Sequence, residues 1–254
     1  MKLGFLYAGQ GSQHPGMGQD LYEAYPAFRA VLDRADVGFD LKALCFQGPE
    51  QQLSQTRYTQ PCMVAFAAGL TAVLREQGIA PDLVAGLSLG EYSALAAAGV
   101  LEEQTAISLA AFRGKAMEEA AAGRDSAMVA VLGLDRERLL EAVREAEPLG
   151  AVVIANYNCP GQLVLGGERA AVQQAAALAK ARGARRCVPL RVSGPFHTPL
   201  MAPAGAALEE RFRDIPFREP EIPVLFNCLG REKAPEDRIP ALLVRQVQSS
   251  VYME

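Results

Sequence analysis

The spacing of apolar and polar residues predicts helices and strands that alternate along the chain. Residues 83–85 form a short apolar run, typical of a buried strand, and an alanine-rich segment that ends at Ala98 follows after a tight turn. Residues 1–8 are read as a first core strand. Helical patterns cover residues 21–44, and a long helix is expected to begin at Gln60. This alternation predicts an α/β fold.

The clearest pattern lies between residues 126 and 191. Strand-like and helical segments follow one another there in the order β-α-β-β-α-β, which is the order of a ferredoxin-like unit. We expect these elements at residues 127–132, 135–146, 151–155, 162–165, 168–182 and 185–190. The sequence thus predicts a small domain at 126–191, inserted into a large α/β domain made of residues 1–125 and 192–254.

Composition narrows the class of protein. The 254 residues are 50% hydrophobic and 21% charged, which is ordinary for a globular protein that buries a large core. The net charge of −4 argues against general nucleic-acid binding, and we expect no membrane span. Five scattered cysteines without paired spacing predict free thiols in a cytoplasmic protein with no metal site.

A Gly-x-Ser-x-Gly pattern at residues 86–90 lies in the predicted turn between a strand and a helix. In that context the pattern indicates a nucleophile elbow, with Ser88 at the helix N-terminus, where backbone N–H groups can stabilise an oxyanion. The alternative is a glycine-rich turn that holds a serine by chance. The flanking strand and helix favour catalysis.

The glycine-rich segment at residues 9–18 follows the first predicted strand. It matches neither the P-loop nor the dinucleotide-binding pattern, and it is either a flexible connection or, as we favour, a loop that approaches a ligand.

The sequence has only two histidines, His14 and His197, so only these can supply an imidazole base to Ser88. Prolines on both sides of His197 indicate a rigid turn, and we therefore prefer His197. Arg113 falls in a predicted helix beside Gly114, a residue that weakens helices. Arg113 therefore lies either on a solvent-exposed face of the helix or at a point where another group comes close to the helix.

Five segments together resemble the malonyl-CoA:acyl carrier protein transacylases, in the order and spacing of that family. The segments are Gly-Gln-Gly-Ser-Gln at 9–13, Gly-Leu-Ser-Leu-Gly-Glu-Tyr-Ser-Ala-Leu at 86–95, Arg-Gly-Lys-Ala-Met at 113–117, Asn-Tyr-Asn-Cys-Pro-Gly-Gln at 156–162 and Gly-Pro-Phe-His-Thr-Pro-Leu-Met at 194–201. The resemblance implies a hydrolase-like large domain with a ferredoxin-like small domain. It also implies transfer of a malonyl group from malonyl-CoA to an acyl carrier protein for fatty acid synthesis, without a cofactor.

The resemblance further implies a role for each matching residue. Ser88 is the expected nucleophile and His197 its general base, oriented by a backbone carbonyl that is best matched at Gln246. Gln10 and Leu89 would supply the oxyanion hole. The substrate-binding residues would be Arg113 for the malonyl carboxylate, Phe196 for selection of unbranched malonyl groups, and Met117 and Asn158.

The chain departs from the family pattern after Gln246, because members continue with further core elements whereas this sequence stops at Glu254. On that basis the C-terminus is expected to be short for the family. Two rival functions stay open at this point. One is an esterase or thioesterase, which would need a triad acid between Ser88 and His197. Asp125 and Asp135 lie in that interval, but in the small unit or its lead-in and not at the end of a large-domain strand. The other is a protein that binds CoA or carrier protein without turnover.

Overall fold

The computed structural model describes residues 2–254, which form a mixed α/β fold with two sheets. The chain divides into two compact units, and each is described by itself. The first contains residues 1–115, 213–226 and 231–236, and the second contains residues 116–212, 227–230 and 237–254. This division by contacts differs from the division predicted at residues 126 and 191, which stays a prediction.

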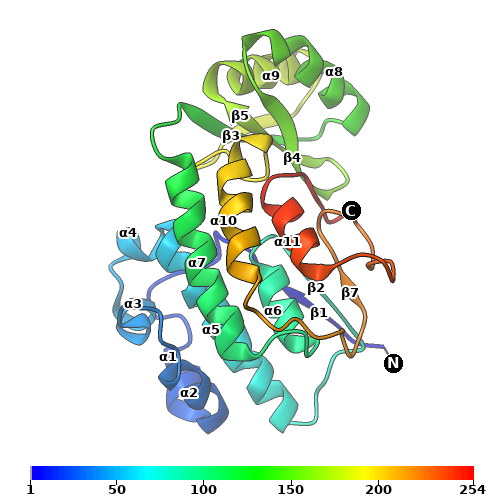
Figure 1. The fold of residues 1–254 in the computed structure, drawn as a ribbon. Helices are drawn as coiled ribbons and strands as arrows, with labels where there is room; N and C mark the ends of the chain where they lie inside the picture. The colour runs from blue at the N-terminus through cyan, green and yellow to red at the C-terminus, as the bar shows by residue number, and fades with distance from the viewer. Residues whose placement is uncertain (1) are drawn as a thin grey trace. The chain divides into compact units, whose positions relative to one another are not determined.

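The first unit is built around a parallel sheet with the strand order β1-β2-β7. Figure 1 shows α5 and α6 next to β1 and β2. The strands are β1 (Gly4–Tyr7), β2 (Leu83–Gly86) and β7 (Val224–Leu225). The helices are α1 (Gln19–Ala24), α2 (Pro26–Asp33), α3 (Leu41–Gln47), α4 (Glu50–Leu53), α5 (Thr56–Glu76) and α6 (Gly90–Ala97). Helix α7 (Glu103–Ala121) begins in this unit and ends in the second.

The first predicted strand is present as β1, which pairs with β2 in the described part of the chain; its Tyr7 side chain is buried and its Leu6 side chain is 71% exposed. One prediction for the first unit is wrong in detail. Helix α5 begins at Thr56 rather than at Gln60, and Pro61 lies inside it. Pro61 was interpreted as the first residue of the helix, because proline lacks an N–H donor and the first N–H groups of a helix need no partner within the helix.

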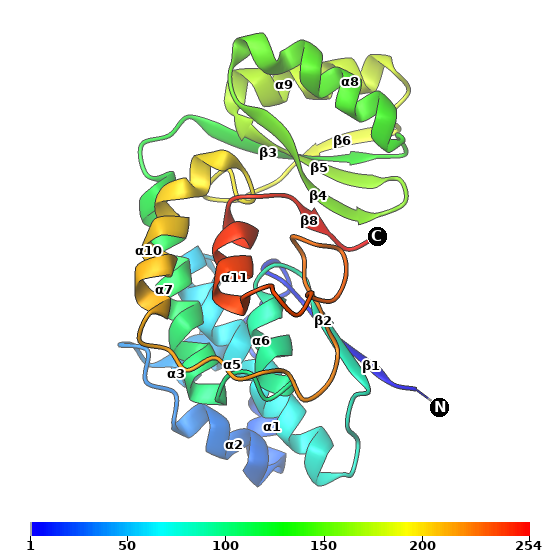
Figure 2. The ribbon, with the colours of Figure 1, turned by 45° about the vertical axis from the view of Figure 1, so that its right-hand side comes forward.

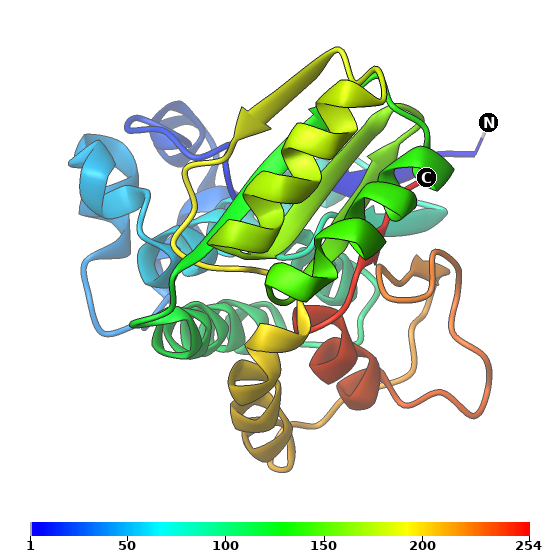
Figure 3. The same cartoon turned by 90° about the horizontal axis from the view of Figure 1, so that it is seen from above.

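The second unit contains a five-stranded sheet with the order β6-β3-β5-β4-β8. Figures 2 and 3 show α8 and α9 together on one face of this sheet. The elements are β3 (Ser126–Leu132), α8 (Arg136–Ala146), η1 (Glu147–Leu149), β4 (Val152–Cys159), β5 (Gln162–Glu168), α9 (Arg169–Ala181) and β6 (Arg186–Pro189). Further along the chain follow η2 (Pro199–Met201), α10 (Ala202–Phe212), α11 (Ile239–Val247) and β8 (Val251–Tyr252).

The element order predicted for residues 126–191 agrees with the structure. Asp135 caps α8 as expected, because its side chain accepts a hydrogen bond from the Arg138 N–H at 2.9 Å. Inward-facing residues of β3 and β5, such as Val131 and Leu165, alternate with outward-facing ones and pack against α8 and α9. Strand β8, which pairs parallel to β4, was not predicted.

No helix within residues 2–254 combines the length and the apolar character that a membrane crossing requires. In the same part of the chain, no group of three or more histidine, cysteine or acidic side chains is arranged to hold a metal ion.

Candidate active site

Ser88 lies in a sharp turn between β2 and α6, as the sequence predicts. Its φ angle is 53°, in the left-handed region that a serine rarely adopts. The turn is so tight that a Cβ atom on Gly86 would lie 2.0 Å from the carbonyl carbon of Gly90, and one on Gly90 would lie 2.4 Å from the Tyr7 carbonyl oxygen. Both positions therefore require glycine, and the strained serine at the N-terminus of α6 has the backbone of a nucleophile elbow.

Arg113 of α7 is 1% exposed and donates from Nη2 to the Ser88 Oγ at 3.0 Å. Its Nη1 donates to Oε1 of Gln60, which is also buried, at 2.9 Å. Burial lowers the pKa of Arg113, while the nearby Glu91 carboxylate acts in the opposite direction. The guanidinium of arginine is always charged in proteins. The first unit therefore holds a buried cation beside the elbow serine.

Gly114 explains how Arg113 reaches this position. A Cβ atom on Gly114 would lie 2.7 Å from the Thr56 carbonyl oxygen and 2.9 Å from the Arg57 Cα, so α7 contacts the backbone of α5 directly at this glycine. The sequence left open whether Arg113 faces solvent or a close neighbour, and the structure shows the close neighbour.

We expect Gly114→Ala to lower stability, although alanine is the better helix former by about 1 kcal/mol. Overlap with the α5 backbone costs about 1–3 kcal/mol and outweighs that gain. Thermal unfolding should show a Tm lower by a few degrees, because Arg113 and Gln60 are forced apart. An unchanged or higher Tm would contradict this account of the contact.

Gln10 and Leu89 also lie in the first unit. The Gln10 side chain donates from Nε2 to the Thr56 Oγ1 at 3.1 Å, and the neighbouring Gly9 comes so close to Leu87 that a Cβ atom there would lie 2.7 Å from the Leu87 carbonyl oxygen. Leu89 is buried as the N-cap residue of α6. The first N–H groups of a helix have no partner within the helix.

His197 lies in the second unit and shares the unusual backbone of Ser88. Its φ angle is 59°, and among residues 2–254 these two are the non-glycine residues with positive φ. The ring is 4% exposed, and its Nδ1 lies 2.9 Å from the Gln246 carbonyl oxygen. Because a carbonyl can only accept, this bond places the proton of the neutral ring on Nδ1 and leaves the lone pair on Nε2. Nε2 is the atom that a general base uses.

The other predicted residues of the second unit have different surroundings. Phe196 and Met117 are buried at 7% and 1% exposure. Asn158 lies at the end of β4, which is longer than predicted, and its Oδ1 is buried without a hydrogen-bond partner among the described residues.

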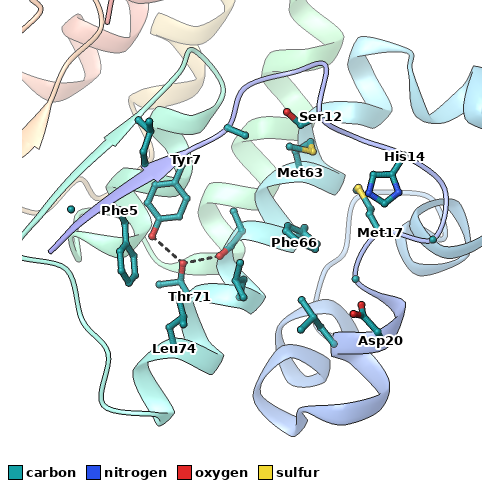
Figure 4. A pocket seen from close by; sticks show the side chains of 18 residues that line it. Phe5, Tyr7, Ser12, His14, Met17, Asp20, Met63, Phe66, Thr71 and Leu74 are labelled. Atoms are coloured by element: carbon teal, nitrogen blue, oxygen red, sulfur yellow. Dashed lines mark hydrogen bonds between the residues drawn. The ribbon is translucent and has the colours of Figure 1, made fainter. Parts of the chain in front are cut away.

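His14, the second candidate base, is exposed, and its Nδ1 lies 3.1 Å from the Pro15 carbonyl oxygen. It lines a mostly apolar cavity of about 770 Å³ in the first unit, together with residues of β1 and α5 such as Tyr7, Phe66 and Leu74 (Figure 4). Ser88 does not line this cavity.

Neither acid proposed for a hydrolase triad is available. Asp125 accepts from Nε of Arg169, and Asp135 caps α8. The position at His197 Nδ1 that a triad acid would take is occupied by the Gln246 carbonyl.

Sequence reasoning missed Gln60 and Tyr92. Gln60 was interpreted only as the start of a helix. A buried glutamine needs a polar partner, but the sequence alone does not show that this glutamine is buried. Tyr92 is completely buried and lies beneath Arg113, with the guanidinium carbon 5.6 Å from its ring centroid. It was quoted only as part of the elbow segment.

Known proteins resemble this chain over nearly its whole length. A model of the acyl transferase domain matches residues 4–252. The malonyl CoA-acyl carrier protein transacylase of Bacillus subtilis is 40% identical over 256 residues, which cover 100% of this chain and 81% of the relative, and that of Escherichia coli K12 is 40% identical over 98% of this chain and 82% of the relative.

Solved structures give the same result. A structure of MCAT from Streptococcus pneumoniae has a TM-score of 0.93 and 46% identity, covering 98% of this chain and 82% of the relative. A type II PKS acyl-carrier protein in complex with its malonyl-transacylase superposes with a TM-score of 0.95 at 41% identity, covering 100% of this chain and 83% of the relative. The chain therefore belongs to the malonyl-CoA:acyl carrier protein transacylases of the acyl transferase domain family.

Proposed function

We propose that this protein transfers the malonyl group of malonyl-CoA to the phosphopantetheine thiol of an acyl carrier protein, through a covalent ester on Ser88. The observation that carries the proposal is the buried Arg113 guanidinium, hydrogen-bonded to the hydroxyl of the elbow serine at 3.0 Å. A cation at that distance from the nucleophile suits an acyl group that ends in a carboxylate.

In the first half-reaction, Ser88 Oγ attacks the thioester carbonyl while Nε2 of His197 takes the hydroxyl proton. Collapse of the tetrahedral intermediate breaks the C–S bond, and His197 returns the proton to the departing CoA thiolate. The bond from Nδ1 to the Gln246 carbonyl orients the ring for this transfer and stabilises the imidazolium that forms.

In the second half-reaction, the phosphopantetheine thiol of the carrier protein takes the place of CoA. His197 removes the thiol proton, the sulfur attacks the malonyl ester, and the proton returns to Ser88 Oγ as the ester bond breaks. The products are malonyl carrier protein and the free enzyme, so the reaction follows ping-pong kinetics.

Arg113 would bind the free carboxylate of the malonyl group with its two-pronged guanidinium. In malonyl-CoA a single methylene separates the carboxylate from the reacting carbonyl. The guanidinium is hydrogen-bonded to Ser88 Oγ before substrate binds. It is therefore close enough to bind the carboxylate of such a short diacid while the thioester carbonyl lies at Ser88. The side-chain Oε1 of Gln60 accepts a hydrogen bond at the other edge of the guanidinium, and this bond limits the motion of the guanidinium.

We assign the oxyanion hole to the backbone N–H groups of Gln10 and Leu89. In the second unit, we assign Met117, Phe196 and Asn158 to the substrate pocket. The bulk of Phe196 would exclude a methyl branch next to the carboxylate, and the ratio of kcat/KM for malonyl-CoA and methylmalonyl-CoA in Phe196→Ala tests that assignment.

The finer description of the fold also belongs to this proposal. Residues 126–191 are proposed as a ferredoxin-like domain inserted into a hydrolase-like domain of residues 1–125 and 192–254, which is supported by the strand order β6-β3-β5-β4 and the two helices on one face. We expect the protein to act in the cytoplasm.

Mass spectrometry of the intact protein tests the proposed function. Incubation with malonyl-CoA should add one malonyl group at Ser88, and addition of holo carrier protein should remove it and yield malonyl carrier protein. Release of free malonate at the same rate with and without carrier protein would instead identify a hydrolase. Absence of the adduct would identify a binding protein.

A further inference from the structure

The buried guanidinium of Arg113 is held by two hydrogen bonds and also lies over an aromatic ring. Gln60 and Ser88 accept hydrogen bonds in the plane of the group. Tyr92, from the first turns of α6, presents its ring to the guanidinium, with 5.6 Å between the guanidinium carbon and the ring centroid. A cation over an aromatic face is attracted by the ring electrons, and the attraction is strongest where both groups are removed from water, as these two are at 1% and 0% exposure.

The hydroxyl group of Tyr92 does not take part in this arrangement. Its oxygen is buried and has no hydrogen-bond partner among the described residues, which is unfavourable for a polar group. Burial raises the pKa of Tyr92, so the side chain stays neutral and provides no counter-charge to Arg113. The favourable contribution of Tyr92 to the site therefore comes from the ring.

Gln60 and Glu91 contribute to the position of Arg113 in other ways. Gln60 accepts a hydrogen bond from Nη1 and holds one edge of the group. The Glu91 carboxylate acts on Arg113 through its charge. The neutral Tyr92 ring, unlike the Glu91 carboxylate, does not repel an arriving malonyl carboxylate.

We propose that Tyr92 is a positioning residue that sets carboxylate specificity: the contact of its ring with Arg113 holds the guanidinium so that both prongs face the malonyl group. This inference rests on the proposed role of Arg113 in malonyl transfer. It extends that role to a residue that does not itself touch the reacting atoms.

The test compares three replacements of Tyr92 by kcat/KM for malonyl-CoA and acetyl-CoA. Tyr92→Phe keeps the ring and removes the unpaired hydroxyl, so both rates should stay within about threefold of the original and the Tm should rise by a few degrees. Tyr92→Leu and Tyr92→Met remove the ring, and malonyl transfer should fall about 10- to 30-fold, the effect of losing a desolvated cation–ring contact. Acetyl transfer needs no carboxylate and should change less than threefold.

Phe28→Leu is the matched control, because Phe28 is a fully buried aromatic residue of the same unit that contacts Phe66 instead of an arginine. It should lower the Tm without changing the ratio of malonyl to acetyl transfer. Equal losses for both thioesters in Tyr92→Leu and Tyr92→Met, or no loss, would overturn the inference. So would a loss in Tyr92→Phe as large as in Tyr92→Leu, since the hydroxyl would then carry the effect. Failure of the unaltered protein to transfer malonyl at all would instead refute the proposed function.

Discussion

Replacement of Ser88 by alanine is expected to abolish the malonyl-enzyme, and replacement of His197 by alanine should slow its formation about 10²–10⁴-fold, the usual contribution of a general base. Without the Ser88 hydroxyl no ester can form. Without the His197 ring the hydroxyl must lose its proton to water as it attacks. Rapid mixing with malonyl-CoA, followed by quenching and mass measurement, gives both rates.

Ser88 and His197 should also act together in one catalytic step, although they belong to different compact units of the chain. Adding His197→Ala to Ser88→Ala should cause no further loss of residual turnover, because residues that act in one step are not additive. His14→Ala is the matched control. Its ring is exposed and borders a cavity that Ser88 does not line, so the rate should be nearly unchanged. A normal rate in His197→Ala together with a slow His14→Ala would show that His14 is the base.

The local parts of this site could be predicted from the sequence because they depend on short-range sterics. The two glycines around Ser88 are needed by the tight turn itself, so their spacing reveals the elbow before any tertiary contact is known. The element order of residues 126–191 could be predicted for a similar reason, since each strand and helix there has a clear period and a defined end.

The parts that could not be predicted depend on contacts between distant segments. Gln60 becomes part of the site because α5 and α7 are in contact at Gly114. Gln60 and Gly114 are 54 positions apart in the sequence, and no pattern in α5 predicts that contact. Strand β1 could be predicted from its composition, but the exposure of its Leu6 side chain depends on which segments pack beside it. The left-handed backbone of His197 is likewise fixed by its surroundings, as histidine does not require it.

The strain at Ser88 and His197 has a consequence for stability. A non-glycine residue with positive φ costs of order 1–3 kcal/mol and persists only where the surrounding structure imposes it. That both such residues among positions 2–254 are the proposed nucleophile and base indicates a backbone selected for reaction geometry over stability.

Arg113→Ala is expected to lower kcat/KM for malonyl-CoA by a hundredfold to a few thousandfold. Removal of one partner of a desolvated, hydrogen-bonded charge pair costs roughly 3–5 kcal/mol, because the other partner is left without its counter-charge. Here the partner left without a counter-charge is the malonyl carboxylate, in a site where the guanidinium is 1% exposed. Acetyl-CoA has no carboxylate, so its transfer should fall little and could even rise once the cation is gone.

Two further variants test whether the charge of Arg113, the geometry of its guanidinium or its contribution to the fold accounts for the loss of malonyl transfer. Arg113→Lys should recover only part of malonyl transfer, since an ammonium group keeps the charge but cannot bond Gln60 and a carboxylate in one plane. Arg75→Ala is the matched control, because Arg75 belongs to the same unit and donates to the Ala97 carbonyl. It should affect both thioesters equally. If Arg113→Ala also lowered malonyl and acetyl transfer in parallel, Arg113 would support the fold and not the substrate. The selection of a diacid would then have to come from another cation of the site.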